Sequence, residues 1–210
     1  MNGSVLTLDD DLLRTSRVPA LAGAHRGAVR PLELAALATA GVVASLLTNL
    51  LRLHLGIPGS SIVFAAFPIA LGFALVPRRG AGGVMGGAAL VTTVVLWLAG
   101  TRIDGVGAQT SLVLTGPLLD VALHWAHTGW RVYIAFLIAC AASNCAAFIV
   151  RAATKGMGLA GMGGGRPFAP WWSQAVVTYA IAGVVAGIIS AAAWFQLRER
   201  RAAASAAMRE

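Results

Sequence analysis

Three residues that could bind a metal ion lie close together in the second half of the chain: Asp120, His124 and His127. Their spacing of i, i+4 and i+7 places them along one face of a helix. A carboxylate and two imidazoles suit a transition metal, so the pattern predicts a candidate metal site. A structural role stays open, because Asp120 could instead pair with Arg131, and histidines beside tryptophans are common at membrane interfaces.

A second set of polar residues lies mostly where apolar segments begin or end. Such side chains can hydrogen-bond a small solute, and most of them are expected near one face of a membrane. The alternative is that they cap helices or form hydrogen bonds between helices. The residues predicted to bind solute are His54, Ser60, Ser61, Asp104, Gln109, Thr110, Thr115 and Asn144.

The sequence lacks the motifs of several other kinds of site. It contains no GxxxxGK[ST] phosphate-binding loop, no HExxH zinc motif and no local serine-hydrolase signature. The only cysteines, Cys140 and Cys145, lie in one apolar run, which argues against a disulfide framework. We therefore expect no ATP hydrolysis by this chain alone and no cofactor other than the possible metal. Any transport would be passive, use an ion gradient or rely on partner subunits.

The elements that position these residues are apolar segments of membrane-spanning length, which is about 20 residues for a helix. We predict an all-α integral membrane protein: a compact bundle of six transmembrane helices over residues 31–197. A polar N-terminal tail covers 1–30, with a short amphipathic helix near Leu12 and Leu13, and a basic C-terminal tail covers 198–210. The predicted spans are 32–51, 58–77, 83–100, 107–126, 131–150 and 172–196.

Composition and charge support this interpretation. Of the residues, 58% are hydrophobic and 11% charged, and the mean hydropathy is +0.77. The net charge of +8 reflects basic residues in the connections rather than a nucleic-acid-binding surface. With both termini cytoplasmic, 11 of the 16 basic residues lie inside, and the other 5 lie outside: Arg52, Arg102, Arg151, Lys155 and Arg166. The positive-inside rule therefore predicts cytoplasmic termini.

Small residues recur four positions apart in several spans, and this spacing lets membrane helices approach closely. Internal packing of the bundle is one interpretation, and docking of another membrane subunit is the other. The pairs are Ala36 with Ala40, Gly82 with Gly86, Gly83 with Gly87, and Gly183 with Gly187. For docking, the best candidate is the face of the first span that carries Ala36 and Ala40.

Short spans, outward loops rich in Gly and Pro, an Ala-rich first span and basic tails resemble the substrate-binding (S) components of energy-coupling factor (ECF) transporters. The stretch from Gly56 to Asp120 is similar to the cobalt/nickel type of S component. In this chain IPGSS (57–61) corresponds to that family's loop leading into span two, and DGVGAQTS (104–111) corresponds to its loop at the start of span four.

The resemblance implies a multi-pass protein of the bacterial inner membrane that captures a nutrient, a vitamin-like molecule or a metal, from outside. Its expected partners are a transmembrane coupling subunit, ATPase subunits, the solute and the lipid bilayer, with no nucleic acid. Two other hypotheses stay open. One is a metal-binding membrane enzyme or oxidase subunit that uses Asp120, His124 and His127, and the other is an accessory structural subunit.

Overall fold

Helices make up most of the part of the chain that the computed structural model describes, which comprises residues 30–50, 59–101, 103, 105–126, 129–157 and 168–207. The helix expected near Leu12 and Leu13 lies outside these residues. The described helices are α2 (Pro31–Leu50), α3 (Ser61–Leu75), α4 (Ala81–Leu98), α5 (Val106–Trp125), α6 (Trp130–Gly156) and α8 (Phe168–Ala207). Each covers most of a predicted span, so the all-helical prediction is confirmed.

Five of these helices are long and apolar enough to cross a membrane, and the sixth, α3, is apolar but has 15 residues. At 1.5 Å per residue α3 is about 22 Å long, shorter than the roughly 30 Å of a hydrocarbon core. The predicted span 58–77 is therefore shorter as a helix than its hydropathy suggested. In the other direction, α8 continues to Ala207, well past the predicted limit of 196.

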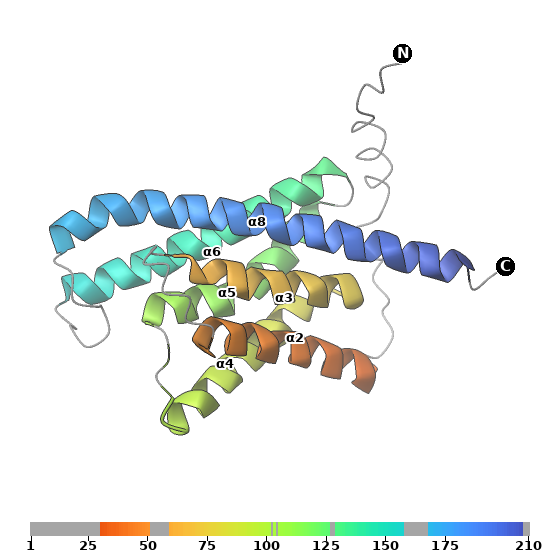
Figure 1. The fold of residues 1–210 in the computed structure, drawn as a ribbon, viewed down its shortest axis with the longest axis horizontal. Coiled ribbons are helices and arrows are strands. Elements are labelled where there is room, and N and C mark those ends of the chain that lie inside the picture. Colours follow the sequence, from red (N-terminus) through yellow and green to blue (C-terminus); the bar gives the residue numbers. More distant parts are fainter. Residues whose placement is uncertain are drawn as a thin grey trace, which may run out of the picture.

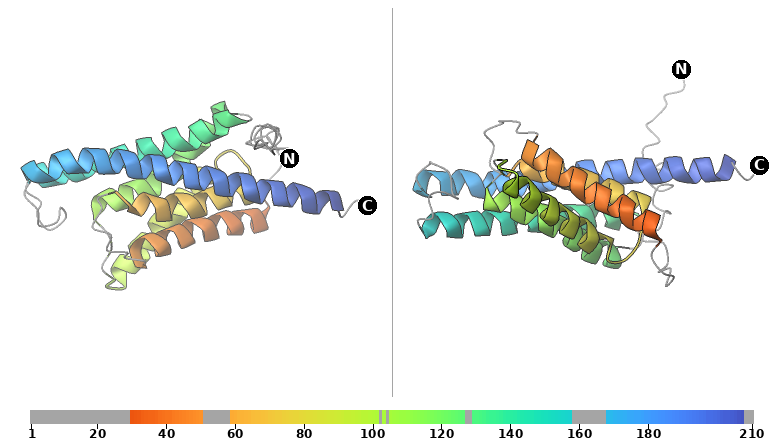
Figure 2. Two further views of the ribbon diagram at one scale, coloured as in Figure 1. Left: turned by 45° about the horizontal axis from the view of Figure 1, so that its top comes forward. Right: turned by 90° about the horizontal axis from the view of Figure 1, so that it is seen from below.

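The helices alternate in direction, and the bundle consequently has two distinct ends (Figure 1). The polar end is formed by the last turns of α2, α4 and α6 with the first turns of α3, α5 and α8. The tail end is formed by the opposite termini of the same helices, so α2 begins and α8 ends there. In the views of Figure 2, α8 projects beyond the other helices at the tail end.

The short helix α3 packs against every other helix, and α8, α6, α5, α4 and α2 follow one another around it. Its buried side chains include Ile62, Ile69 and Phe73. The outer faces of the surrounding helices carry exposed apolar residues, such as Val91 and Trp97 on α4 and Ile181 on α8. Exposed apolar surface over long helices is what a bundle surrounded by lipid requires.

Glycines set the closest helix contacts. Gly82 of α4 lies against the backbone of Gly116 in α5, and a Cβ at Gly86 would lie 2.7 Å from the Val113 carbonyl oxygen. Pro117 has no N–H to donate to that carbonyl, and Gly86 covers it instead. The internal-packing interpretation of these small residues is thus confirmed for α4 and α5.

The glycine pair on α8, Gly183 and Gly187, also allows close contact between helices. Cβ atoms at Gly183 and Gly187 would lie 2.8 Å from Ala141 Cα and Leu137 Cα of α6. Gly83 and Gly87 differ, since nothing lies within 4 Å of a Cβ built on either residue. One small-residue face of α4 therefore packs inside the bundle, while the adjacent one is open.

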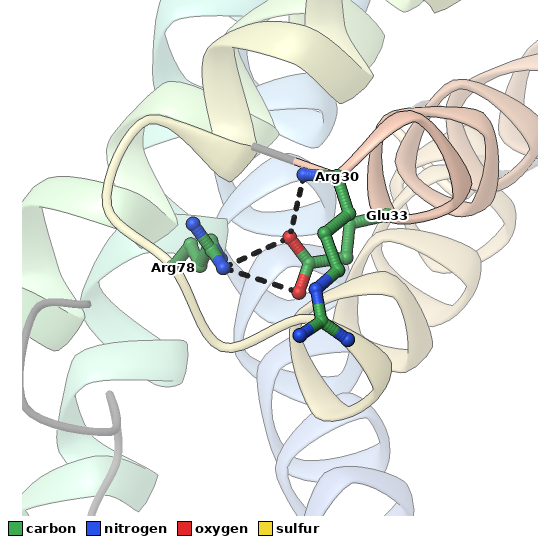
Figure 3. Close-up of polar contacts among 3 residues, drawn as sticks. All are labelled: Arg30, Glu33 and Arg78. Carbon is green, nitrogen blue, oxygen red and sulfur yellow. Dashed lines mark hydrogen bonds and ion pairs between the residues drawn. The ribbon is translucent and has the colours of Figure 1, made fainter. Parts of the chain in front are cut away.

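At the tail end, charged groups join helix termini. Arg78, before α4, pairs with Glu33 in the first turn of α2, with 3.0 Å between Nη2 and Oε2 (Figure 3). The Arg30 backbone N–H also donates to Glu33 Oε2 over 3.3 Å. This contact fastens the start of α2 to the connection between α3 and α4.

Candidate binding site at the polar end

Three helices share a ring of hydrogen bonds at the polar end. Gln109 of α5 donates to Asn49 Oδ1 of α2 over 2.7 Å, and Thr93 of α4 donates to Gln109 Oε1 over 3.0 Å. Ser45 Oγ and Thr93 Oγ1 lie 3.0 Å apart, and Asn49 Nδ2 donates back to the Ser45 carbonyl over 2.9 Å. Because each pairing replaces water in an apolar setting, the ring fixes α2, α4 and α5 together.

A smaller cluster joins α5 to α6. Thr115 Oγ1 lies 2.9 Å from Ser143 Oγ and donates to the Ser111 carbonyl over 2.6 Å. Ser143 Oγ lies 2.9 Å from the same carbonyl oxygen. All three residues are buried, so they form an interhelical clasp.

Asn144 is the most distinctive residue of this end. It is fully buried at 0% exposure. Its Nδ2 donates to the Tyr179 carbonyl over 2.6 Å and to the Gly59 carbonyl over 3.3 Å. Its Oδ1 has no hydrogen-bond partner among the described residues. A buried amide oxygen without a donor costs free energy, which a bound N–H or O–H group would recover.

Nearer the C-terminus of α6 than Asn144, α6 and α8 form an aromatic cluster with two cations. Lys155 Nζ lies 4.9 Å, and Arg151 Cζ 5.8 Å, from the centroid of the Trp171 ring. Arg151 Nη1 donates to the Tyr179 hydroxyl over 3.3 Å. Phe148 packs against Trp171 with ring centroids 5.8 Å apart. The cluster holds positive charge over aromatic surface at the edge of the bundle.

The structure brings several predicted solute-binding residues to the same end. Gln109, Thr115 and Asn144 lie in the contacts described above. Ser60 and Ser61 lie at the start of α3, half-buried, and Thr110 donates to the Val106 carbonyl one turn back in α5. His54 and Asp104 lie outside the described residues. The role of the set in binding stays a prediction.

Sequence reasoning missed the cationic and aromatic members, Arg151, Lys155, Trp171 and Tyr179. In the sequence analysis Arg151 and Lys155 were used only to predict the membrane orientation, although their i, i+4 spacing places them on one face of a helix. That face also carries Asn144, which lies seven residues before Arg151. Partners such as Ser45 and Thr93 have no distinguishing signal, because a hydroxyl within an apolar helix commonly bonds its own backbone.

Two of the predicted metal residues, Asp120 and His124, lie at the tail end. Asp120 Oδ2 accepts a 2.6 Å hydrogen bond from the backbone N–H of Gly80, which immediately precedes α4. His124 packs edge-on against Trp125, and His127 lies outside the described residues. No group of three metal-ligating side chains occurs within the described segments. The observed contact of Asp120 therefore stabilises the start of α4, and the metal site stays a prediction.

Ala36 and Ala40 are half-buried and pack against the central apolar core of this bundle. A Cβ at Gly72 of α3 would lie 3.0 Å from the Ala40 Cβ. This face of α2 therefore takes part in the bundle's own packing, and its role in docking a partner stays a prediction. Comparison with known protein families, curated proteins and solved structures found no match to the chain.

Proposed function

We propose that this chain is the membrane-embedded solute-binding subunit of a nutrient-uptake transporter that partner ATPases energise. The observation that supports the proposal is the buried Asn144 amide, whose Oδ1 has no partner among the described residues. It lies at an end where most of the buried polar side chains gather, although Ser190 of α8 is also buried. A solute with an N–H or O–H group would complete this set of hydrogen bonds.

In this proposal six helices cross the inner membrane of a bacterium, with the tail end in the cytoplasm. The alternation of the helices and the excess of basic residues assigned to the cytoplasmic side support that orientation. The short helix α3 is accommodated because it packs against all five of the other described helices. The polar end then faces outward, where a scarce nutrient arrives.

Native mass spectrometry of the detergent-purified chain tests the binding role. We expect a bound small molecule on the wild type, and its loss from Asn144→Leu, which removes the amide. Thr178→Val is the matched control, because the Thr178 hydroxyl bonds only backbone carbonyls of its own helix. A wild-type mass equal to that of the bare polypeptide, under conditions that retain weak ligands, would favour the accessory-subunit hypothesis.

A second experiment tests the dependence on partners. Co-expression of the genomically adjacent membrane and ATPase subunits should yield a complex and solute uptake. Leucines at Ala36 and Ala40 should prevent assembly, since the added side chains enlarge the proposed docking face. Both alanines also pack against the core of the bundle, so retained solute binding by the free variant is the control that the bundle still folds. A complex that assembles normally with both leucines would remove this face from the proposal.

A further inference from the structure

We infer that the polar end binds an anionic group, a carboxylate or a phosphate, at Arg151 and Lys155 beside the first turn of α5. The inference rests on the proposed function, because it names the chemical class of the solute. It is carried by a juxtaposition of the first turn of α5 with side chains of α6 and α8, which the binding role alone does not require.

The position of Arg151 is fixed on three sides. Its aliphatic stem lies against Gly107 of α5, where an added Cβ would lie 3.2 Å from the Arg151 Cβ. Its guanidinium contacts the Tyr179 hydroxyl and the ring of Trp171. Lys155 lies over the same ring, one turn further along α6. Two cations held at one indole repel each other, and an anion between them relieves that repulsion.

The first turn of α5 adds to the positive potential. The helix begins at Val106, and the residue before it, Gly105, has no side chain to accept a hydrogen bond from the free N–H groups of that turn. The positive end of the helix dipole consequently lies beside the stem of Arg151, which contacts Gly107 in the first turn. An arginine and a helix N-terminus together favour an anion strongly, because both supply N–H donors.

No acidic side chain in the described part of the chain pairs with Arg151. The sequence also offers few candidates, since Asp104 is the only acid between Glu33 and Asp120, and none occurs between Asp120 and Glu199. The described part of the polar end therefore carries basic side chains, Arg151 and Lys155, and no acidic one.

The same face of α6 suggests the shape of the ligand. Arg151 lies seven residues after Asn144, which separates them by about 10 Å along the helix. A molecule of that length could place its anionic group at Arg151 and an N–H or O–H donor at Asn144 Oδ1. Trp171, Phe148 and Tyr179 would supply apolar surface between the two.

Thermal unfolding of the full chain in detergent tests the anion site with two probes, inorganic phosphate and benzoate. Sodium chloride at equal ionic strength is the reference. We expect either probe to raise the melting temperature of the wild type in a saturable way, since a ligand that binds only the folded state stabilises it. Arg151→Gln should weaken the apparent affinity at least tenfold, and the double variant Arg151→Gln/Lys155→Gln should abolish the shift.

The matched control is Arg131→Gln, which removes an exposed arginine from the other end of α6 and should keep the wild-type shift. Arg151→Lys, which retains the charge, keeps the comparison usable if Arg151→Gln fails to fold, and should bind more weakly than the wild type. Equal shifts in the wild type and the Arg151 variants, or no shift in the wild type, would overturn the inference.

Nanodiscs distinguish a free solute from a lipid headgroup as the source of the anion. If phosphatidylglycerol in place of phosphatidylcholine stabilises the wild type but not Arg151→Gln, the site binds a lipid phosphate. If the two lipids act alike while benzoate retains its effect, the site binds a soluble anion. A neutral or cationic co-purified solute whose retention ignores Arg151 would overturn the inference and leave the proposed function intact. Anion binding that depends on Arg151, without any co-purified solute or uptake, would support the inference and contradict the proposed function.

Discussion

The two ends of the bundle are held together by different interactions. At the polar end, side-chain hydrogen bonds cross between helices, as in the ring of Ser45, Asn49, Thr93 and Gln109. Toward the tail end the interior is mostly apolar and aromatic, with Trp194 packed against Phe136 in a tilted arrangement and against Phe195 edge to face. Polar contacts there include Arg78 with Glu33 and Asp120 with Gly80, which join helix termini.

This difference separates two ways of holding a helix bundle together: close packing at one end and interhelical hydrogen bonds at the other. Lipid offers little hydrophobic drive between helices, so close packing at glycines must hold the apolar half. The polar half is held instead by hydrogen bonds, which a ligand can join or exchange. If this is correct, added volume should be most damaging on the packed face of α4, and lost polar groups most damaging at the polar end.

The largest effect is expected from Gly82→Ala. The added methyl group would collide with the backbone of Gly116, so α4 and α5 must separate, which costs about 1–3 kcal/mol. Gly83→Ala is the matched control, because nothing lies within 4 Å of a Cβ there. The measurement is the thermal unfolding midpoint of each variant in detergent. Equal midpoints for the two variants would mean that the contact of α4 with α5 is not tight.

The next effect is expected from Gln109→Leu at the polar end. It removes a donor from Asn49 Oδ1 and an acceptor from Thr93, and we expect a loss of roughly 1–2 kcal/mol. Thr110→Val, next in sequence, removes a hydroxyl that bonds its own helix and should change stability little. Stability measured without added solute separates this structural role from binding. Unchanged stability in Gln109→Leu would mean that interhelical hydrogen bonds do not hold the polar end together.

Asp120→Ala should have a somewhat smaller effect at the tail end. It removes the acceptor of the Gly80 N–H at the start of α4, and loss of such a terminal acceptor costs about 0.5–2 kcal/mol. Asp120→Asn, which keeps an acceptor but loses the charge, should lie between Ala and the wild type. Metal analysis of the same preparations tests the remaining hypothesis for Asp120, His124 and His127. Equal metal content in the wild type and both variants would exclude Asp120 as a ligand.

Much of the fold could be predicted because hydropathy and helix length follow from local sequence. Apolar runs near 20 residues predicted each helix. Glycine spacing indicated Gly82 and Gly183 as candidates for close packing, but it indicated Gly83 and Gly87 equally, where nothing lies within 4 Å of an added Cβ. Hydropathy did not show that the run around Ser61 would form only a 15-residue helix surrounded by the others. It also could not show that α8 continues past its apolar part to Ala207, because a polar helix carries no hydropathy signal.

The candidate site could be predicted only as a region. Gln109, Thr115 and Asn144 stood out as polar residues within apolar segments, and they lie at the same end. Their partners depend on which helices become neighbours, as when Asn144 meets the backbone of Tyr179 35 residues later. Arg151 was counted for topology alone, because nothing local reveals that Trp171 and Tyr179 pack against it.

The smallest expected effect is that of Glu33→Gln at the tail end, and it sharpens the comparison of the two ends. Glu33 and Arg78 have 28% and 19% of their side chains exposed, so solvent screens their attraction, and we expect a loss of about 1 kcal/mol or less. A double-mutant cycle with Arg78→Gln isolates the pair, and rising salt should shrink its coupling energy while leaving that of Gln109 with Asn49 unchanged. Because the bond between Gln109 and Asn49 joins two neutral amides, salt should not screen it, and a salt-dependent coupling there would show that a charged group takes part in the ring.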